Sequence, residues 1–120
     1  MTSALLLGHK AEDKALDYLQ HHGLKLVMRN YRCRVGEIDL IMRDGSYLVF
    51  IEVRSRKSSD FGGGIESITY AKRQKIIKTA SHYLMHYSVH ERYPIRFDVI
   101  SIDGNANKIT WLKDAFGADY

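Results

Sequence analysis

Hydrophobic residues recur along the chain with two different periods, which predict two helices and five strands. Residues 4–22 follow a helical period of about 3.6, and Gly23 ends this helix. A second helical pattern runs from a capping Thr69 to about Tyr87. Strands are expected over residues 24–33, 36–43, 47–55, 95–102 and 109–112. The order α-β-β-β-α-β-β predicts a single α/β domain over residues 1–120, with helices packed on one mixed sheet.

The second and third strands are joined by Asp44-Gly45, a dipeptide typical of tight hairpin turns. With these residues at the centre of the turn, Glu37 would lie opposite Glu52. Asp39 would then be a diagonal neighbour of Glu52, at roughly 7 Å between their Cα atoms. Side chains alternate between the faces of a strand. Four functional side chains are therefore expected on one face: Glu37, Asp39, Glu52 and Arg54.

Three carboxylates on one face of a buried strand pair need a positive partner, because like charges that face each other destabilise a sheet. A hard divalent cation such as Mg²⁺ (or Mn²⁺) is held by one or two carboxylates, and waters and phosphate oxygens complete its shell. The acids therefore predict a metal site. In the alternative interpretation, they form ordinary ion pairs with Arg54, Arg32 or Arg34.

Glu12 falls on the apolar stripe of the first helix, among Ala11, Ala15 and Leu19. A buried glutamate without a partner is rare. Because this stripe must pack on the sheet, we expect Glu12 to reach the acids as a further ligand or as a partner of metal-bound waters. The alternative is a core salt bridge between Glu12 and an arginine.

The composition favours a polyanionic partner and gives no sign of a membrane segment. Eighteen Lys and Arg against fourteen Asp and Glu give a formal net charge of +4. The apolar run at residues 4–7 is far too short to span a membrane. Cys33 is the only cysteine, which excludes an internal disulfide and a Cys-based zinc site. We expect a cytoplasmic protein.

Four segments carry a resemblance to a known family. They are GEIDLI at residues 36–41, FIEVR at residues 50–54, Ala11-Glu12 in the first helix and RFDVI at residues 96–100. Across nearly the whole chain, these segments resemble the YraN family of bacterial proteins. That family in turn resembles the PD-(D/E)XK nucleases, especially archaeal-type Holliday junction resolvases.

The resemblance implies a restriction-endonuclease-like fold, a Mg²⁺-dependent endonuclease activity and a branched-DNA substrate. By motif, Asp39 matches the first metal-binding aspartate, Glu52 the acid of the second half-motif and Glu12 the helix glutamate. Glu37 would assist through waters, and the carbonyl of Val53 would add a metal ligand. A resolvase that cuts two strands symmetrically would also need a homodimer.

Arg54 departs from the pattern of these nucleases, which have a catalytic lysine at this position. An arginine stays protonated at neutral pH and cannot act as a general base. It can still bind the scissile phosphate in a bidentate manner and stabilise negative charge, while the metal acidifies the attacking water.

Basic residues near the second helix are expected to contact nucleic acid. The candidates are Arg56 and Lys57 before this helix, and Lys72, Gln74 and Lys75 in its first turns. Phe61 could stack on a base. A solvated helix face with ordinary lysines is the alternative. His82 and His86, four residues apart, also form a weak zinc pair that has no evident third ligand.

The sequence thus predicts an endonuclease that binds structured or branched DNA and hydrolyses a phosphodiester with Mg²⁺. Two other functions stay open. The chain could be a non-catalytic nucleic-acid-binding module of the same fold, for which Arg54 is the main argument. It could also be a structural or adaptor protein whose acids form a buried ion-pair network.

Overall fold

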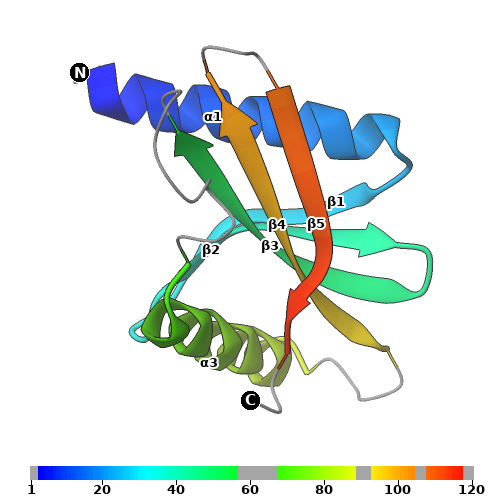
Figure 1. Cartoon of the computed structure of the whole chain (residues 1–120). Coiled ribbons are helices and arrows are strands. Elements are labelled where there is room, and N and C mark those ends of the chain that lie inside the picture. Colours follow the sequence, from blue (N-terminus) through cyan, green and yellow to red (C-terminus); the bar gives the residue numbers. More distant parts are fainter. Residues whose placement is uncertain (1–2, 57–67, 89–92, 105–107, 118–120) are drawn as a thin grey trace.

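The computed structural model describes residues 3–56, 68–88, 93–104 and 108–117. Its helices and strands follow the predicted order (Figure 1). They are the helix α1 (Ser3–His21), the strands β1 (Lys25–Arg32), β2 (Glu37–Asp44) and β3 (Tyr47–Arg56), the helix α3 (Tyr70–His86), and the strands β4 (Ile95–Asp103) and β5 (Lys108–Phe116). The predicted α/β class and element order are confirmed, and β5 extends four residues beyond its predicted end.

The five strands form one mixed sheet in the order β1-β2-β3-β4-β5. Only β3 and β4 run parallel, and the three other neighbouring pairs are antiparallel. The parallel pair requires a crossover between β3 and β4, and α3 lies in this connection. In this strand order β3, which carries Glu52, is the central strand of the sheet.

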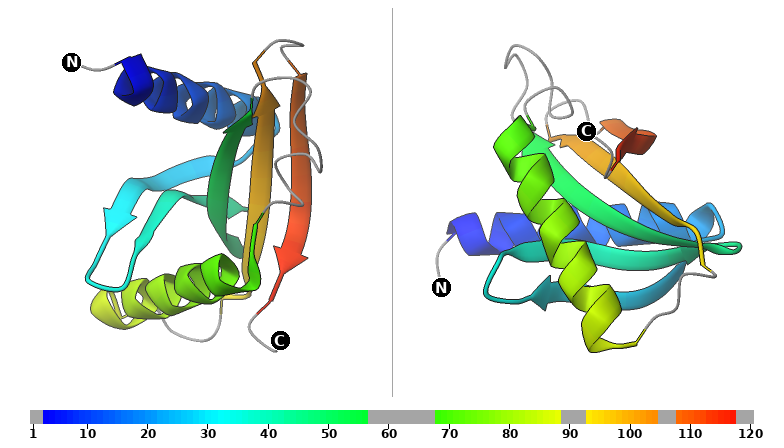
Figure 2. Two further views of the ribbon diagram at one scale, coloured as in Figure 1. Left: turned by 60° about the vertical axis from the view of Figure 1, so that its left-hand side comes forward. Right: turned by 90° about the horizontal axis from the view of Figure 1, so that it is seen from below.

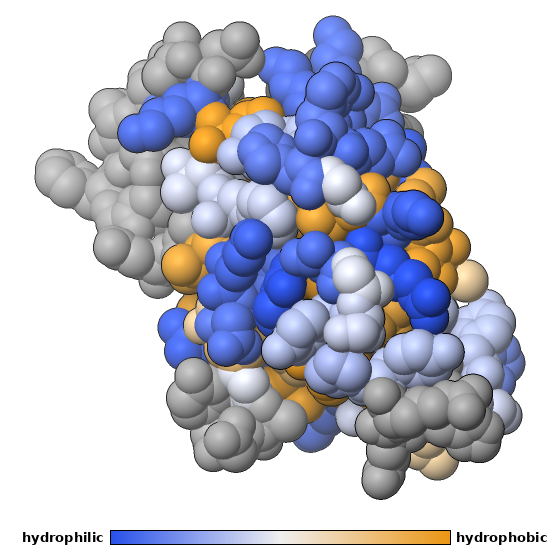
Figure 3. Space-filling model, turned by 90° about the vertical axis from the view of Figure 1, so that its right-hand side faces the viewer, coloured by the Kyte–Doolittle hydropathy of each residue, from blue (hydrophilic) through white to orange (hydrophobic). Residues whose placement is uncertain are grey.

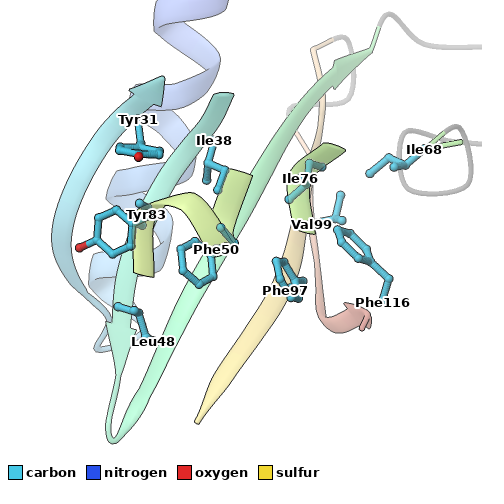
Figure 4. Packing of buried hydrophobic residues seen from close by; sticks show 12 residues of the cluster. Tyr31, Ile38, Leu48, Phe50, Ile68, Ile76, Tyr83, Phe97, Val99 and Phe116 are labelled. Carbon is cyan, nitrogen blue, oxygen red and sulfur yellow. The ribbon is translucent and has the colours of Figure 1, made fainter. Parts of the chain in front are cut away.

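The two helices cover opposite faces of the twisted sheet, and β1 and β2 lie between them (Figures 1 and 2). Each interface has its own hydrophobic core. The core under α1 includes Ala15, Leu19, Leu40 and Ile51. The core under α3, shown in Figure 4, includes Phe50, Ile76, Tyr83 and Phe97. Alternate residues of β3 thus enter different cores, as expected for a strand that is buried on both faces.

The β2–β3 hairpin has a different turn from the predicted one. Asp44 pairs with Tyr47, so Gly45 and Ser46 form the two-residue loop. Gly45 has a φ of 60°, and the favoured two-residue hairpin turns require a positive φ at this first loop position. The prediction that Asp44 and Gly45 form the centre of the turn is therefore wrong, and the register of the two strands moves by two residues.

Gly36, the first residue of the GEIDLI segment, allows the chain before β2 to approach α3 closely. A Cβ atom at this position would lie 2.9 Å from Oγ1 of Thr79. Thr79 is fully buried, and its hydroxyl donates a hydrogen bond to the carbonyl of Lys75 at 2.7 Å. Because this hydroxyl is held in place, only glycine fits here without a shift of the helix.

The RFDVI segment contains a buried network that joins three strands. Asp98 has no exposed surface and accepts two hydrogen bonds from Arg96, each 2.9 Å long. It accepts two more from the indole of Trp111 and the backbone N–H of Asp114 on β5. Arg96 also binds Asp44 at the end of β2. Since all of these polar groups have partners, this segment has a structural role.

Polar side chains dominate the side of the molecule that lies at the right of Figure 1, where the turn between β2 and β3 is found. Figure 3 looks onto this side, where hydrophobic residues show only in smaller areas between hydrophilic ones. Within the described parts of the chain, neither helix is both long and apolar enough to cross a membrane.

Candidate functional site

Asp39 and Glu52 face each other across the β2–β3 pair. The strands pair as far as Leu40 and Ile51, and the next residues along this register are Asp39 and Glu52. Oδ2 of Asp39 accepts a hydrogen bond from the backbone N–H of Val53 at 2.8 Å. The prediction that Glu37 faces Glu52 is wrong, because the turn moves the register by two residues. Since this shift is even, the acids stay on the predicted face.

Of the two facing carboxyl groups, Asp39 strongly favours its protonated form. Burial raises the pKa of Asp39 from 3.8 to about 8, with further contributions from the charge of Glu52, a hydrogen bond between the two side chains and the charge of Glu12. The hydrogen bond from Val53 lowers this pKa and offsets only part of the shift. At neutral pH and without a cation, Asp39 therefore favours its protonated form.

A cleft of about 540 Å³ opens onto these acids. One wall comes from the chain that leads into β2 and from the facing ends of β2 and β3, and the other comes from the first turns of α3. It is lined by Val35, Gly36, Glu37, Asp39, Glu52, Val53, Thr69, Ala71, Lys72, Lys75 and Ile76. The cleft therefore combines carboxylates from the sheet with lysines from a helix N-terminus.

Thr69 caps α3 as predicted, because its hydroxyl oxygen accepts a hydrogen bond from the backbone N–H of Lys72. The cap fixes the first turn at the mouth of the cleft. From this turn, Nζ of Lys72 reaches Oε2 of Glu52 at 2.9 Å. Nη1 of Arg54 lies 3.9 Å from the same oxygen. Two basic side chains thus converge on one oxygen of Glu52, and the lysine is much closer.

Glu37 lies at the rim of the cleft and forms an ion pair with Arg32 at 3.1 Å between Oε2 and Nε. Both side chains are more than half exposed. An exposed pair of this kind contributes little to stability. The interpretation of the acids as ordinary ion pairs therefore describes Glu37 and Arg32 well, but it does not describe Asp39, for which the described residues provide no ion pair.

Glu12 packs from α1 toward the acid pair, and its charge contributes to the raised pKa of Asp39. It also lies 3.5 Å from Nη2 of Arg29 on β1. This contact is the core salt bridge that the sequence left open as the alternative. Arg29 lies closer to Asp13, at 2.8 Å. The oxygen of Glu12 that faces Arg29 is Oε1, which is buried and makes no hydrogen bond among the described residues, so it can still accept one from a water molecule.

The donor set fits a hard cation that keeps much of its water shell. In the described ranges, no three His, Cys, Asp or Glu side chains are grouped as a complete metal cage. Mg²⁺ does not need such a cage, since it is commonly bound through one or two carboxylates together with waters and phosphate oxygens. Asp39 and Glu52 are such a pair, and the orphan oxygen of Glu12 could accept from a bound water.

The predicted nucleic-acid contacts divide into two groups. Lys72 and Lys75 line the cleft, whereas Gln74 does not. Lys57, Phe61 and the side chain of Arg56 lie outside the described residues. Of the predicted zinc pair, His82 contacts the hydroxyl of Tyr31 through Nδ1, and the described residues offer no third ligand.

The sequence did not indicate two features of this site. One is the contact between Lys72 and Glu52, because a lysine on an exposed helix turn looks like any solvated lysine. The other is Arg29 as the partner of Glu12. The available signal was the position of Arg29, a basic residue in the partly buried section of β1 that lies next to Glu12.

A sequence profile of the uncharacterised protein family UPF0102 matches residues 11–102. Curated relatives have similar lengths. A UPF0102 protein of Legionella pneumophila (strain Corby) is 68% identical over 111 residues, which cover 92% of this chain and 94% of the relative. One from Nitrosococcus oceani is 51% identical over 91% of this chain and 90% of the relative. One from Pseudomonas fluorescens (strain Pf0-1) is 46% identical over 95% of both chains.

Proposed function

The chain belongs to the UPF0102 family, the YraN family that its motifs resemble, and we propose that it is a metal-dependent endonuclease acting on structured or branched DNA. The proposed cofactor is Mg²⁺ or Mn²⁺, bound by Asp39 and Glu52. A cytoplasmic location and a homodimer that cuts two strands symmetrically are parts of the same proposal.

One observation carries this proposal. Glu52 is buried and Asp39 is partly buried, their carboxyl groups face each other in a cleft, and Asp39 has no cationic partner among the described residues. A purely structural network would neutralise both groups, as Asp98 and Arg96 show on the neighbouring strand. A carboxyl group held beside another acid without a cationic partner is costly for the fold, and a divalent cation would remove that cost.

Each side chain has a distinct role in the proposed reaction. Asp39 and Glu52 would hold the metal, and Glu12 would accept a hydrogen bond from one of its waters through its orphan oxygen. The bound metal would supply an acidified water and neutralise charge on the phosphate. Arg54 would bind the scissile phosphate, because its guanidinium already lies beside Glu52.

The cleft also suits a polyanion. Lys72 and Lys75 line it, and the N-terminus of α3 directs its partial positive charge and free N–H groups toward the same space. Helix N-termini and lysines are common phosphate ligands in DNA complexes. The preference for branched DNA rests on the resemblance alone.

The second candidate function is a nucleic-acid-binding module without turnover, and Arg54 is the observation that favours it. An arginine beside Glu52 can bind phosphate but cannot take a proton from water. Such a module would need the same metal and the same cleft, so only product formation separates it from an endonuclease.

The test is incubation of the purified chain with end-labelled four-way junctions, flaps and single strands, in Mg²⁺ or Mn²⁺ and in EDTA. Cleavage that requires the metal and disappears in Glu52→Gln supports the endonuclease. Metal-dependent binding without product from any substrate supports the binding module. If neither metal nor DNA binds, the acids belong to a structural protein.

A further inference from the structure

Lys72 occupies an unusual position for a helix-surface lysine. Its side chain is 46% exposed, yet its ammonium lies 2.9 Å from Glu52, whose side chain is only 8% exposed. The capped first turn of α3 fixes the start of the lysine side chain, and the long stem delivers the charge into the cleft. A lysine on the partly exposed first turn of α3 thus places its charge next to a buried acid.

Lys72 supplies a positive charge to the acid pair in the absence of a metal. Glu52 is a buried carboxylate, and a buried negative charge needs a positive partner. The ammonium of Lys72 neutralises that charge directly, whereas Arg54 lies at the outer limit of an ion pair. Lys72 therefore takes the position of the cation that the two acids require.

A divalent cation changes this balance. A metal held by Asp39 and Glu52 would take over the neutralisation of the two carboxylates. The positive charge of Lys72 would then be in excess and would be repelled by the metal ion. A lysine side chain is flexible enough to leave, and the cleft beside it is open.

We propose that Lys72 is an internal counter-ion of Glu52 that a divalent metal displaces and that then binds the phosphate of the anionic ligand. This inference rests on the proposed function, because it assumes a metal at Asp39 and Glu52. It adds an order to binding, in which the metal enters first and frees a lysine for the nucleic acid.

The first test is calorimetric titration of Mg²⁺ and of Mn²⁺ into the wild type, Lys72→Met and Lys78→Met at equal ionic strength. Lys78 is exposed on the same helix and does not line the cleft, so its variant removes the same charge without the contact. Lys72→Met should bind the metal about 3- to 10-fold more tightly than the wild type, and Lys78→Met should change the affinity less than about 2-fold.

Three outcomes separate this inference from the proposed function. If Lys72→Met binds metal no more tightly than Lys78→Met, the inference is overturned and the metal site stands. If neither the wild type nor Lys72→Met binds metal, both are overturned. If only Lys72→Met binds metal, the lysine blocks the site and is not displaced by the metal, which overturns the inference.

The second test follows the lysine to its new partner. The anisotropy of a fluorescein-labelled four-way DNA junction would be measured with Mn²⁺ and with EDTA, and the junction would be checked for integrity afterwards. Metal should strengthen binding by the wild type and by Lys78→Met, and Lys72→Met should lose most of this gain despite its tighter metal site. An equal gain in Lys72→Met and Lys78→Met would exclude transfer of the lysine to phosphate.

Discussion

The backbone N–H of Val53 on β3 donates a hydrogen bond to the carboxyl group of Asp39 on β2, at a distance of 2.8 Å. A side chain thus binds a backbone group at the point where the regular pairing of the two strands ends. This bond favours the ionised form of Asp39, but burial and the neighbouring Glu52 act more strongly in the opposite direction. The balance between these effects makes Asp39 a sensitive probe of the site.

The first prediction concerns stability against pH. The pKa of Asp39 is about 8 in the folded chain and 3.8 in the reference state, so between these values the folded chain binds one more proton than the unfolded chain. Stability contributed by this group is complete below pH 4 and is lost as the pH rises to about 8, by at most about 1.4 kcal/mol per pH unit.

The measurement is urea unfolding at pH 5, 6, 7 and 8 in the presence of EDTA. Asp39→Asn should lose this contribution, because an amide resembles the protonated acid and does not titrate in this range. The stability of the wild type should therefore fall relative to that of Asp39→Asn as the pH rises. Parallel curves for the two proteins would show that Asp39 is ionised throughout.

The second prediction concerns metal binding. A ligand that binds only the folded chain raises its stability, and at a metal concentration ten times the Kd the gain is about 1.4 kcal/mol, or several °C in Tm. Thermal unfolding with and without Mg²⁺ or Mn²⁺ should show this shift in the wild type. Asp39→Asn and Glu52→Gln should abolish it.

Asp17→Asn is the matched control, since it removes a carboxylate that is exposed on α1 and pairs only with His21 among the described residues. This variant should keep the full metal-dependent shift. A similar loss of the shift in all three variants would indicate nonspecific binding to surface charge.

The third prediction concerns Gly36. In Gly36→Ala, the new methyl group would press on the buried hydroxyl of Thr79. The strain should cost about 1 to 3 kcal/mol, which exceeds the smaller gain from the stiffer unfolded chain. Chemical unfolding of Gly36→Ala, Thr79→Ala and the double variant measures the coupling between the two positions. The double variant should be more stable than the sum of the single effects, whereas strict additivity would place the strain elsewhere.

The fourth prediction concerns Asp98. Asp98→Asn removes a fully buried charge from the network of Arg96 and Trp111, and should cost about 3 kcal/mol. Asp44→Asn removes the more exposed partner of the same arginine and should cost under about 1 kcal/mol. Unfolding followed by the fluorescence of Trp111, the single tryptophan of the chain, compares both variants with the wild type. Equal costs would contradict a central role for Asp98.

Much of the fold could be predicted from local patterns, because periodicity and turn residues act within a short stretch of chain. The cap at Thr69 and the element order are examples. The hairpin register could not be fixed in this way. Gly45 can be the first or the second residue of a two-residue turn, and the sequence alone does not distinguish Asp44-Gly45 from Gly45-Ser46.

The parts of the candidate site that depend on the alternation of side chains along a strand could be predicted from the sequence. The parts that depend on how a helix packs against the sheet could not. Asp39 and Glu52 share a face in either register, because a shift by two residues preserves the alternation of side chains. The contact of Lys72 with Glu52 depends on where α3 lies against the sheet, and no local pattern contains that information.

The contact between Gly36 and Thr79 also bears on the width of the cleft. Gly36 belongs both to the wall of the cleft and to the contact with α3, so the bare backbone at this residue fixes how far the strand wall stands from the helix wall. Side-chain volume at this position therefore acts as a spacer between the carboxylates and the lysines. Under the proposed function, graded replacements at Gly36 should alter discrimination between narrow single strands and wider duplexes, without any change in the groups proposed to contact the phosphate.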